Sequence, residues 1–444
     1  MKERFSRRSF LKRAVTASIA GPLIVPRLSL ASPPSGRLQH AAVGVGGQGG
    51  YDLGQIFSSG KVDVVALCDI DKKNLDKAAQ TYPGARLYRD WREMLEKEEK
   101  NIDSVSVGIP DHMHAPVSMT AIRKGKHVYC EKPLTHEVYE ARQLTLAARK
   151  KGVATQMGNQ IHSHDFYRTA VHWVKEGAIG KAIKWHSWCA TLFPTGDKTR
   201  PAGADPVPAH IEWNLWLGVA PERPYKSEVY HPFWWRRWRD FGGGATGDFG
   251  CHIFDPVFTA LGIGPPLTIT CEVESVNNEM WPEWTIAHYV FPGTQMTTGT
   301  TIHATWRDGG KQPAVDESPH LPNDMALPPS GSMIVGEEGT IIIPHVGPPQ
   351  LYPLEKFKDY PKPELEPKNH YHEFVEAALG HGQCGCHFDY AGPLAEAVLL
   401  ANVADRFPGR TLEWDAKRLR FTNSADANKY LRRPYRRGWK VRGL

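Results

Sequence analysis

The sequence predicts two domains: an α/β domain built on a parallel sheet, then an α+β domain with a mainly antiparallel, open sheet. Three observations predict this arrangement. The chain has 444 residues, which is more than one small core needs. Strand and helix patterns alternate as far as residue 157, as is typical of a parallel sheet covered by helices. Beyond that point strand-like runs such as AIKWHSWCA and LTITCEVESV follow one another without regular helices between them.

Residues 1–31 have the composition of an export signal. A basic start, the apolar run AVTASIAGPLIV and small residues near LSLAS follow in that order. Gly21, Pro22 and Pro26 break the apolar run, so it is too short to span a bilayer. The stretch SRRSFLK resembles a twin-arginine signal at Ser6, Arg7, Arg8, Phe10, Leu11 and Lys12. We therefore expect cleavage near Ala31 and a periplasmic protein that folds before export.

The charge of the chain is concentrated at its start. The formal net charge is +6, and residues 1–31 carry seven basic residues and one acidic residue, so the remainder is nearly neutral. A neutral body argues against nucleic acid as a partner, and no later run is long enough for stable membrane insertion. The seven cysteines are scattered and odd in number, which predicts neither a disulfide framework nor a zinc site. The basic stretch LRRPYRRGWK is interpreted as a solvated or inter-subunit surface.

A glycine-rich turn opens the first domain. The stretch RLQHAAVGVGGQGGYDLGQIF has the pattern of a strand, a turn and the start of a helix. Gly44, Gly46 and Gly49 satisfy G-x-G-x-x-G, in which the glycines permit a tight turn, a close approach to a pyrophosphate and close helix packing. Phosphates would face the N–H groups at the helix N-terminus, next to Gly47 and Gln48. The turn therefore predicts a dinucleotide site.

A carboxylate follows the second predicted strand. VDVVALCDID ends at Asp69, twenty residues after Gly49. A carboxylate there accepts hydrogen bonds from a ribose 2′-hydroxyl and repels a 2′-phosphate, which favours NAD over NADP. Asp71 is the alternative residue for this role.

Further short motifs follow the glycine turn in a fixed order. PDHMHA comes after a later strand, EKP after the next, and GDFGCHIFD lies in the second half. Together they resemble the Gfo/Idh/MocA family of glucose–fructose oxidoreductase and inositol dehydrogenase, in its exported branch. The resemblance implies a signal peptide at 1–31, an NAD-binding Rossmann domain at 36–157 and a substrate-binding and oligomerisation domain at 158–444. It also implies a carbohydrate or polyol substrate and a homo-oligomer formed through the C-terminal sheet.

Three residues fit the chemistry of oxidising a hydroxyl group. By resemblance, Lys132 of EKP hydrogen-bonds the reacting hydroxyl and the nicotinamide ribose. Asp248 and His252 are four residues apart, so they share a face if their segment is helical. A histidine titrates near the operating pH, and we expect His252 to accept the hydroxyl proton. Asp248 would orient it or bind a second sugar hydroxyl.

The remaining site residues are expected around these three. Glu131 would orient Lys132 or the cofactor, and Pro110 and His114 would lie along the nicotinamide ribose. Asn159 and His162, near the crossover between the domains, are weaker candidates for substrate contacts, and no metal is expected there because the histidine spacing matches no ligand motif. Trp235 and Arg236 belong to a segment rich in Trp and Arg that suits either sugar stacking or a packed aromatic core.

Three functions remain open at this point. The first is an NAD-dependent sugar or polyol oxidoreductase with a tightly bound, recycled cofactor. The alternative is an NAD-dependent glycoside hydrolase or lyase that oxidises its sugar transiently. Relatives of the second kind often depart from EKP, whereas Glu131, Lys132 and Pro133 keep it. A silent sugar-binding protein on the same fold is a third reading.

Overall fold

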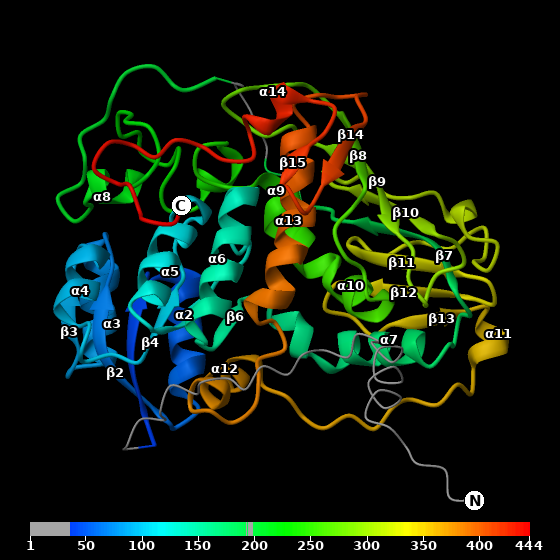
Figure 1. Ribbon diagram of the computed structural model, residues 1–444, viewed down its shortest axis with the longest axis horizontal. Helices are drawn as coiled ribbons and strands as arrows, with labels where there is room; N and C mark the ends of the chain where they lie inside the picture. Colours follow the sequence, from blue (N-terminus) through cyan, green and yellow to red (C-terminus); the bar gives the residue numbers. More distant parts are fainter. Residues whose placement is uncertain (1–35, 192, 194–198) are drawn as a thin grey trace, which may run out of the picture.

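The computed structural model describes residues 36–191, 193 and 199–444, so the expected signal at residues 1–31 lies outside the described part. Two sheets form the body of the protein, with the long helix α13 between them (Figure 1). No helix among the described residues is long and apolar enough to cross a membrane.

The first sheet has six parallel strands in the order β3-β2-β1-β4-β5-β6. The order reverses between β1 and β4, and ligands of such sheets bind at the carboxyl ends of the strands beside that point. The strands and helices are β1 (Leu38–Val43), α2 (Gly47–Phe57), β2 (Val62–Cys68), α3 (Lys72–Thr81), β3 (Arg86–Tyr88), α4 (Trp91–Lys97), β4 (Ser104–Val107), η1 (Asp111–Met113), α5 (His114–Arg123), β5 (His127–Cys130), α6 (Val138–Lys151) and β6 (Thr155–Met157).

The second sheet has nine strands in the order β13-β12-β11-β7-β10-β9-β8-β14-β15. All its pairs are antiparallel except β7 with β10, which confirms the mainly antiparallel sheet expected from the sequence. The strands are β7 (Ala182–Trp188), β8 (Thr268–Val273), β9 (Thr285–Pro292), β10 (Thr301–Arg307), β11 (Gly331–Gly336), β12 (Thr340–Pro344), β13 (Gln350–Tyr352), β14 (Leu412–Asp415) and β15 (Arg420–Phe421).

Helices fill the space between the sheets. Helix α13 is apolar all round because it contacts α6 of the first domain, α9 and strand β8. Its buried Glu396 forms a two-pronged ion pair with Arg142 of α6, at 2.6 and 2.7 Å. The other helices are η2 (Gln160–Ser163), α7 (Asp165–Lys175), α8 (Trp213–Leu217), η3 (Trp234–Arg237), α9 (Gly244–Ile253), α10 (Asp255–Leu261), η4 (Val315–Glu317), α11 (Leu354–Phe357), α12 (His370–Ala378), α13 (Phe388–Ala404) and α14 (Ala425–Asn428).

The basic C-terminal segment, residues 431–444, is exposed at several positions, as expected of a solvated stretch, and is bound to its own chain at others. It runs from α14 across the first domain toward α8 (Figure 1). Tyr435 donates to Glu140 at 2.5 Å, and the Arg436 guanidinium donates to Gly218 O at 3.0 Å. Glu140 is buried at the start of α6 and needs donors, which this segment supplies. Local charge alone does not reveal such a partner within the same chain.

Candidate functional site

A cavity of about 750 Å³ lies at the carboxyl ends of the parallel strands. One side is formed by the glycine turn, Asp69 and the ends of β4 and β5. The other side comes from residues of the second domain between 215 and 252, including α9. The cavity therefore brings the predicted dinucleotide turn and the predicted catalytic residues to one place.

The glycine turn has the geometry that its motif predicts. Gly44 adopts φ +82°, and a Cβ there would overlap Gly108 O. A Cβ on Gly49 would overlap Gly44 O and Gly108 O, so this glycine lets α2 pack against the end of β4. The helix begins at Gly47 with its N-terminus toward the cavity, and Gly46, Gly47 and Gln48 also line it. These residues fit the pyrophosphate of a dinucleotide.

Asp69 lies at the end of β2 and lines the cavity. Its Oδ2 accepts a hydrogen bond from Val45 N at 2.9 Å, and its Oδ1 accepts one from Asp71 N at 2.8 Å. Burial raises the pKa of this carboxyl, and those two donors oppose the rise. The carboxylate is thus fixed beside the glycine turn, where a ribose 2′-hydroxyl would be bound.

Asp71 has a different task from Asp69. It caps α3 by accepting from Lys73 N, and its carboxylate also contacts His210 Nδ1 at 2.9 Å. His210 belongs to a hydrogen-bonded turn and the β-bridge that follows it, residues 208–212, which we call the strap. Lys72 N donates to His210 O, and Glu212 N donates to Ile70 O. The strap therefore ties the second domain to the turn between β2 and α3.

Lys132 and Asp248 form the central ion pair of the cavity. Lys132 Nζ donates to Asp248 Oδ1 at 2.6 Å and to Asp248 O at 3.0 Å. An ammonium has three N–H groups, so one remains for a substrate oxygen. Arg236 Nε lies 3.6 Å from Asp248 Oδ2. Burial raises the pKa of Asp248, but the charges of Lys132 and Arg236 outweigh it, so the net shift is downward.

His252 lies one turn after Asp248 on α9, and both line the cavity as the four-residue spacing predicts. The expected pairing between them is not formed, because Asp248 is directed at Lys132 and Arg236 instead. No described residue hydrogen-bonds His252 Nδ1. The centroids of the His252 and His345 rings are 5.5 Å apart. Burial first, and then the charge of Lys132, hold the pKa of His252 well below its usual value. The imidazole is therefore neutral.

Glu131 is buried behind the lysine. Its Oε2 accepts from Lys132 N at 3.2 Å, and its Oε1 accepts from Gln160 Nε2 at 2.7 Å. Burial raises the pKa of Glu131 and of Asp52 on α2, and the charge of Asp52 adds to the rise at Glu131. Glu131 thus fixes the backbone that carries Lys132, in line with the orienting role expected of it.

Of the two residues expected along the nicotinamide ribose, only one lines the cavity. Pro110 lines the cavity. His114 does not, because its ring is buried with Nδ1 2.7 Å from Pro133 O and Nε2 2.6 Å from Ile109 O. His114 therefore holds the EKP turn against the end of β4 and contacts the cofactor site only through these backbone groups.

Asp111 was not singled out in the sequence. It follows Pro110 at the start of η1, is buried and lines the cavity with Lys132. The available signal was its place directly after a strand end, within PDHMHA. The expected site residues of that motif included a histidine instead.

The segment rich in Trp and Arg forms a packed aromatic cluster and also part of the cavity wall. Trp213 stacks on Trp216, with ring centroids 4.7 Å apart and an angle of 11° between the ring planes. Trp216, Trp235 and Arg236 line the cavity, and the Arg236 guanidinium lies 4.2 Å from the Trp235 ring centre. The packed part is the cluster of Trp216, Leu217, Ala220, Tyr230, Trp235, Trp238, Phe241 and Met280.

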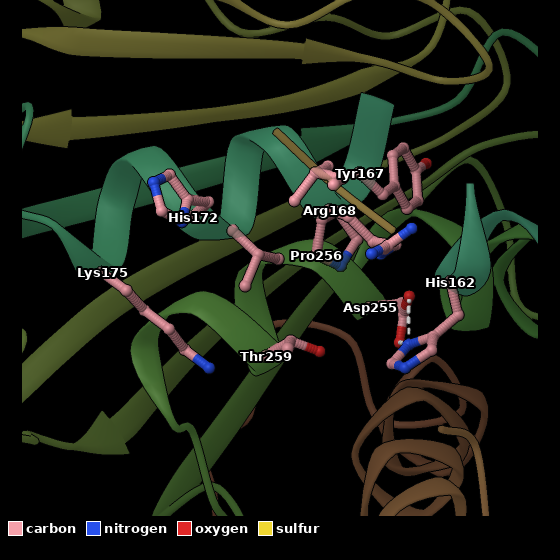
Figure 2. Close-up of a pocket in the computed structure, with 10 residues that line it drawn as sticks. His162, Tyr167, Arg168, His172, Lys175, Asp255, Pro256 and Thr259 are labelled. Carbon is pink, nitrogen blue, oxygen red and sulfur yellow. Dashed lines mark hydrogen bonds and ion pairs between the residues drawn. The ribbon is translucent and has the colours of Figure 1, made fainter. Parts of the chain in front are cut away.

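Asn159 and His162 do not line the main cavity. Asn159 is fully buried, and His162 Nδ1 lies 2.9 and 3.0 Å from the two carboxylate oxygens of Asp255. Figure 2 shows this pair at the edge of a separate, smaller pocket beside α7. The structure therefore gives His162 a pairing role with Asp255, at a distance from Lys132.

Cys386 approaches the same pair. Ligand atoms of His162, Asp255 and Cys386 lie within 4.8 Å of one another. Burial raises the pKa of the Cys386 thiol well above its usual value, and Tyr390 OH donates to Asp255 Oδ1 at 2.5 Å. Because Asp255 already has two hydrogen-bond partners, His162 and Tyr390, we assign no metal to this group.

The comparisons with known proteins agree with this fold. Residues 38–159 match the model described as "Oxidoreductase family, NAD-binding Rossmann fold". Residues 182–295 match the model described as "Oxidoreductase family, C-terminal alpha/beta domain". These are the two domain models of one family. The chain belongs to the Gfo/Idh/MocA family of oxidoreductases, and its first domain is the NAD-binding Rossmann domain of that family.

Among curated proteins, the chain is similar to levoglucosan dehydrogenase of Pseudarthrobacter phenanthrenivorans, at 24% identity over 40% of this chain and 37% of the relative. It is also similar to glycosyl hydrolase family 109 protein 2 of Bacteroides fragilis, at 29% identity over 35% of this chain and 38% of the relative. The chain thus spans less than half the length of these two relatives.

Among solved structures, the WlbA dehydrogenase of Bordetella pertussis, in complex with NADH and UDP-GlcNAcA, has a similar fold. The TM-score is 0.60 at 17% sequence identity, over 85% of this chain and 99% of that chain.

Proposed function

We propose that the protein is an NAD-dependent oxidoreductase acting on a hydroxyl group of a sugar, glycoside or polyol. One observation carries the proposal. The Lys132–Asp248 ion pair lies in the same cavity as the glycine turn and Asp69, with one ammonium N–H left for a substrate oxygen. Proteins to which the chain is similar include a dehydrogenase named for the anhydrosugar levoglucosan.

The residues of the cavity divide the work of such a reaction. NAD, when bound, supplies the hydride acceptor. Lys132 binds the hydroxyl oxygen and stabilises negative charge that develops on it, while Asp248, itself paired with Arg236, holds the lysine in place. Trp216 and Trp235 offer apolar faces for the C–H side of a sugar ring. His252 as the acceptor of the hydroxyl proton stays a prediction.

The experiment is an assay of sugars, glycosides and polyols for NADH formation, with a matched pair of lysine variants. Lys132→Met should keep the fold and NAD affinity while turnover falls by about 10²–10⁴-fold. Lys97→Met is the control, since Lys97 is an exposed residue of α4 that pairs with Glu93, away from the cavity. Full turnover by Lys132→Met would remove the basis of the proposal.

A second candidate function is glycoside cleavage through transient oxidation. The similarity to a protein named glycosyl hydrolase family 109 favours it. The same site would serve, because the sugar would be oxidised and then reduced again without net NADH. Release of a free sugar from glycosides, with no build-up of NADH, distinguishes this function from net dehydrogenation.

We also propose that the protein is exported through the twin-arginine pathway with NAD already bound and retained. SRRSFLK supports the export route, and a site walled by both domains supports retention. Protein isolated from the periplasm and then denatured should release close to one NAD per chain. Recovery of empty protein that works only with added NAD would contradict retention.

The proposed oligomer uses the open sheet of the second domain. Ile183 of β7 and His288 of β9 are exposed on this sheet. Light scattering should show a multiple of the chain mass. A charged substitution, Ile183→Glu, should lower that mass if this face forms the contact.

A further inference from the structure

One carboxyl group in the cavity has no part in the chemistry described so far. Asp111 lies at the carboxyl end of β4, lines the cavity together with Lys132 and Asp248, and exposes only 2% of its surface. Its Oδ2 accepts a hydrogen bond from Gly243 N at 2.9 Å. Gly243 immediately precedes α9, so this bond fixes Asp111 against the helix that carries Asp248 and His252.

Oxidation of an alcohol needs a group that accepts the hydroxyl proton, and three of the neighbouring groups suit this poorly. Burial lowers the pKa of Lys132, but the charges of Asp248 and Glu131 outweigh it, so the lysine stays an ammonium. Asp248 is a carboxylate already engaged by Lys132 and Arg236. His252 is a weak base, because burial and the charge of Lys132 both disfavour its protonated form.

Asp111 has the properties that these groups lack. Burial raises its pKa to about 7, and the charge of Asp248 on α9 adds to the rise. Arg236 of η3, Lys132 after β5 and the Gly243 N–H favour the carboxylate and oppose it. A group with a pKa near the working pH both accepts and returns a proton efficiently.

We propose that Asp111, rather than His252, accepts the proton of the substrate hydroxyl group. This inference rests on the proposed function. In the oxidation, the O–H bond breaks and its proton passes to the Asp111 carboxylate. The C–H bond of the same carbon breaks, and its electron pair leaves as a hydride to NAD. The carbon is oxidised by two electrons to a carbonyl group, and NAD is reduced by the same two. His252 stays uncharged and hydrogen-bonds a neighbouring hydroxyl.

The test compares Asp111→Asn with His252→Asn in pH profiles of kcat/KM. Asparagine keeps the size of Asp111 and an oxygen that accepts from Gly243 N, so the fold should survive. We expect wild-type kcat/KM for oxidation to fall about tenfold for each pH unit below the pKa of about 7, because the acceptor becomes protonated. Asp111→Asn should lose this limb and about 10²–10⁴-fold in kcat/KM. His252→Asn should keep the limb.

A second readout does not depend on turnover. Difference infrared spectroscopy of wild-type protein, with Asp111→Asn as the reference, should show one carboxyl band that titrates near pH 7. Titration of that band below about pH 5, near the ordinary range of aspartate, would overturn the proposal. So would a limb that persists in Asp111→Asn and disappears in His252→Asn. Failure of wild-type protein to oxidise any carbohydrate or polyol would instead reject the proposed function on which it rests.

Discussion

Asp69 performs two tasks with one side chain. Its two oxygens accept hydrogen bonds from Val45 N and Asp71 N, which fixes the glycine turn against the start of α3. Its negative charge stands beside the cavity, where it repels a 2′-phosphate. The first task needs a hydrogen-bond acceptor, whereas the second needs the charge. A substitution that separates the two is therefore informative.

Asp69→Asn removes the charge and keeps one of the two acceptor oxygens, so one of the two backbone hydrogen bonds is lost with it. We expect the preference for NAD over NADP to fall by about 5–30-fold, which corresponds to about 1–2 kcal/mol. Calorimetric titration of cofactor-free protein with each dinucleotide measures this preference. If wild-type protein already prefers NADP, the role given to Asp69 is wrong.

At the residue scale, the sequence predicted which side chains meet better than it predicted how they pair. Short motifs predicted Lys132, Asp248 and His252 as site residues, and all three line one cavity. Helical spacing showed that Asp248 and His252 share a face of α9. It could not show that this face meets the end of β5, so the Lys132–Asp248 pair was missed. Such a contact joins residues far apart in sequence, and no local pattern encodes it.

Helix α2 contains glycines with opposite requirements. Gly49 packs against the end of β4, where a Cβ would overlap Gly44 O and Gly108 O. Gly54 is on the same helix, and a Cβ there would meet nothing within 4 Å. The helix therefore offers a matched pair of sites for the same substitution.

Gly49→Ala should lower the free energy of unfolding by about 1–3 kcal/mol, because the helix must move away from β4. It should also weaken NAD binding, since that movement displaces the turn. Gly54→Ala should leave NAD binding unchanged and raise the free energy of unfolding by about 0.4–1 kcal/mol. Urea titrations and NAD titrations of both variants test this. Equal effects of the two would contradict the close packing at Gly49.

Strand β1 carries a buried histidine that makes the first sheet sensitive to acid. His40 Nδ1 lies 2.8 Å from Ser104 Oγ, and Nε2 lies 3.0 Å from Ser106 Oγ, both on β4. Burial lowers the pKa of His40 from 6.5 to about 3. The unfolded chain binds a proton at this residue below pH 6.5, whereas the folded chain does so only near pH 3. The histidine therefore favours the folded state less and less as pH falls through that window.

The predicted cost at pH 5 is about 2 kcal/mol of unfolding free energy from this residue alone. His40→Gln removes the titration and keeps hydrogen-bonding groups for the two serines. From pH 7 to pH 5, the variant should lose about 2 kcal/mol less stability than the wild type. Urea unfolding at both pH values measures the difference. Parallel losses would show that His40 is protonated in the folded state.

At the element scale, prediction succeeded where strands were long and apolar. The stretches that became β7, β8, β9, β10 and β12 were recognisable by β-branched and aromatic residues. Strand β11 begins at the end of the Pro-rich stretch 311–332, whose prolines hide a strand pattern, and β13–β15 have only two to four residues each. The parallel pairing of β7 with β10 has no local signature, because it depends on which strands lie between them in space.

Across the whole molecule, the strap joins the two walls of the cavity. His210 pairs with Asp71, and its backbone oxygen accepts from Lys72 N. Trp216 and Phe233, which follow the strap in the chain, line the cavity. Departure of a bound dinucleotide would require these walls to separate. We therefore expect the strap to control how fast NAD dissociates.

His210→Ala should raise the NAD dissociation rate about 5–30-fold, because about 1–2 kcal/mol of contact energy is lost from a partly exposed pair. Displacement of bound NADH by excess NAD, followed by fluorescence, gives this rate. His288→Ala is the control, since His288 pairs with Glu272 on the surface of the second sheet. An unchanged rate in His210→Ala would show that NAD leaves without opening the strap.

The C-terminal segment is synthesised last, long after the domain that it stabilises. Residues up to 157 contain the whole dinucleotide sheet, yet Tyr435 and Arg436, which brace it against α8, are made much later. At about 5–20 residues per second, the ribosome needs roughly 15–60 s to reach them. During that interval the first half can fold without this bracing. A dinucleotide present where translation occurs would then bind before the C-terminal segment ties α6 to the region of Gly218.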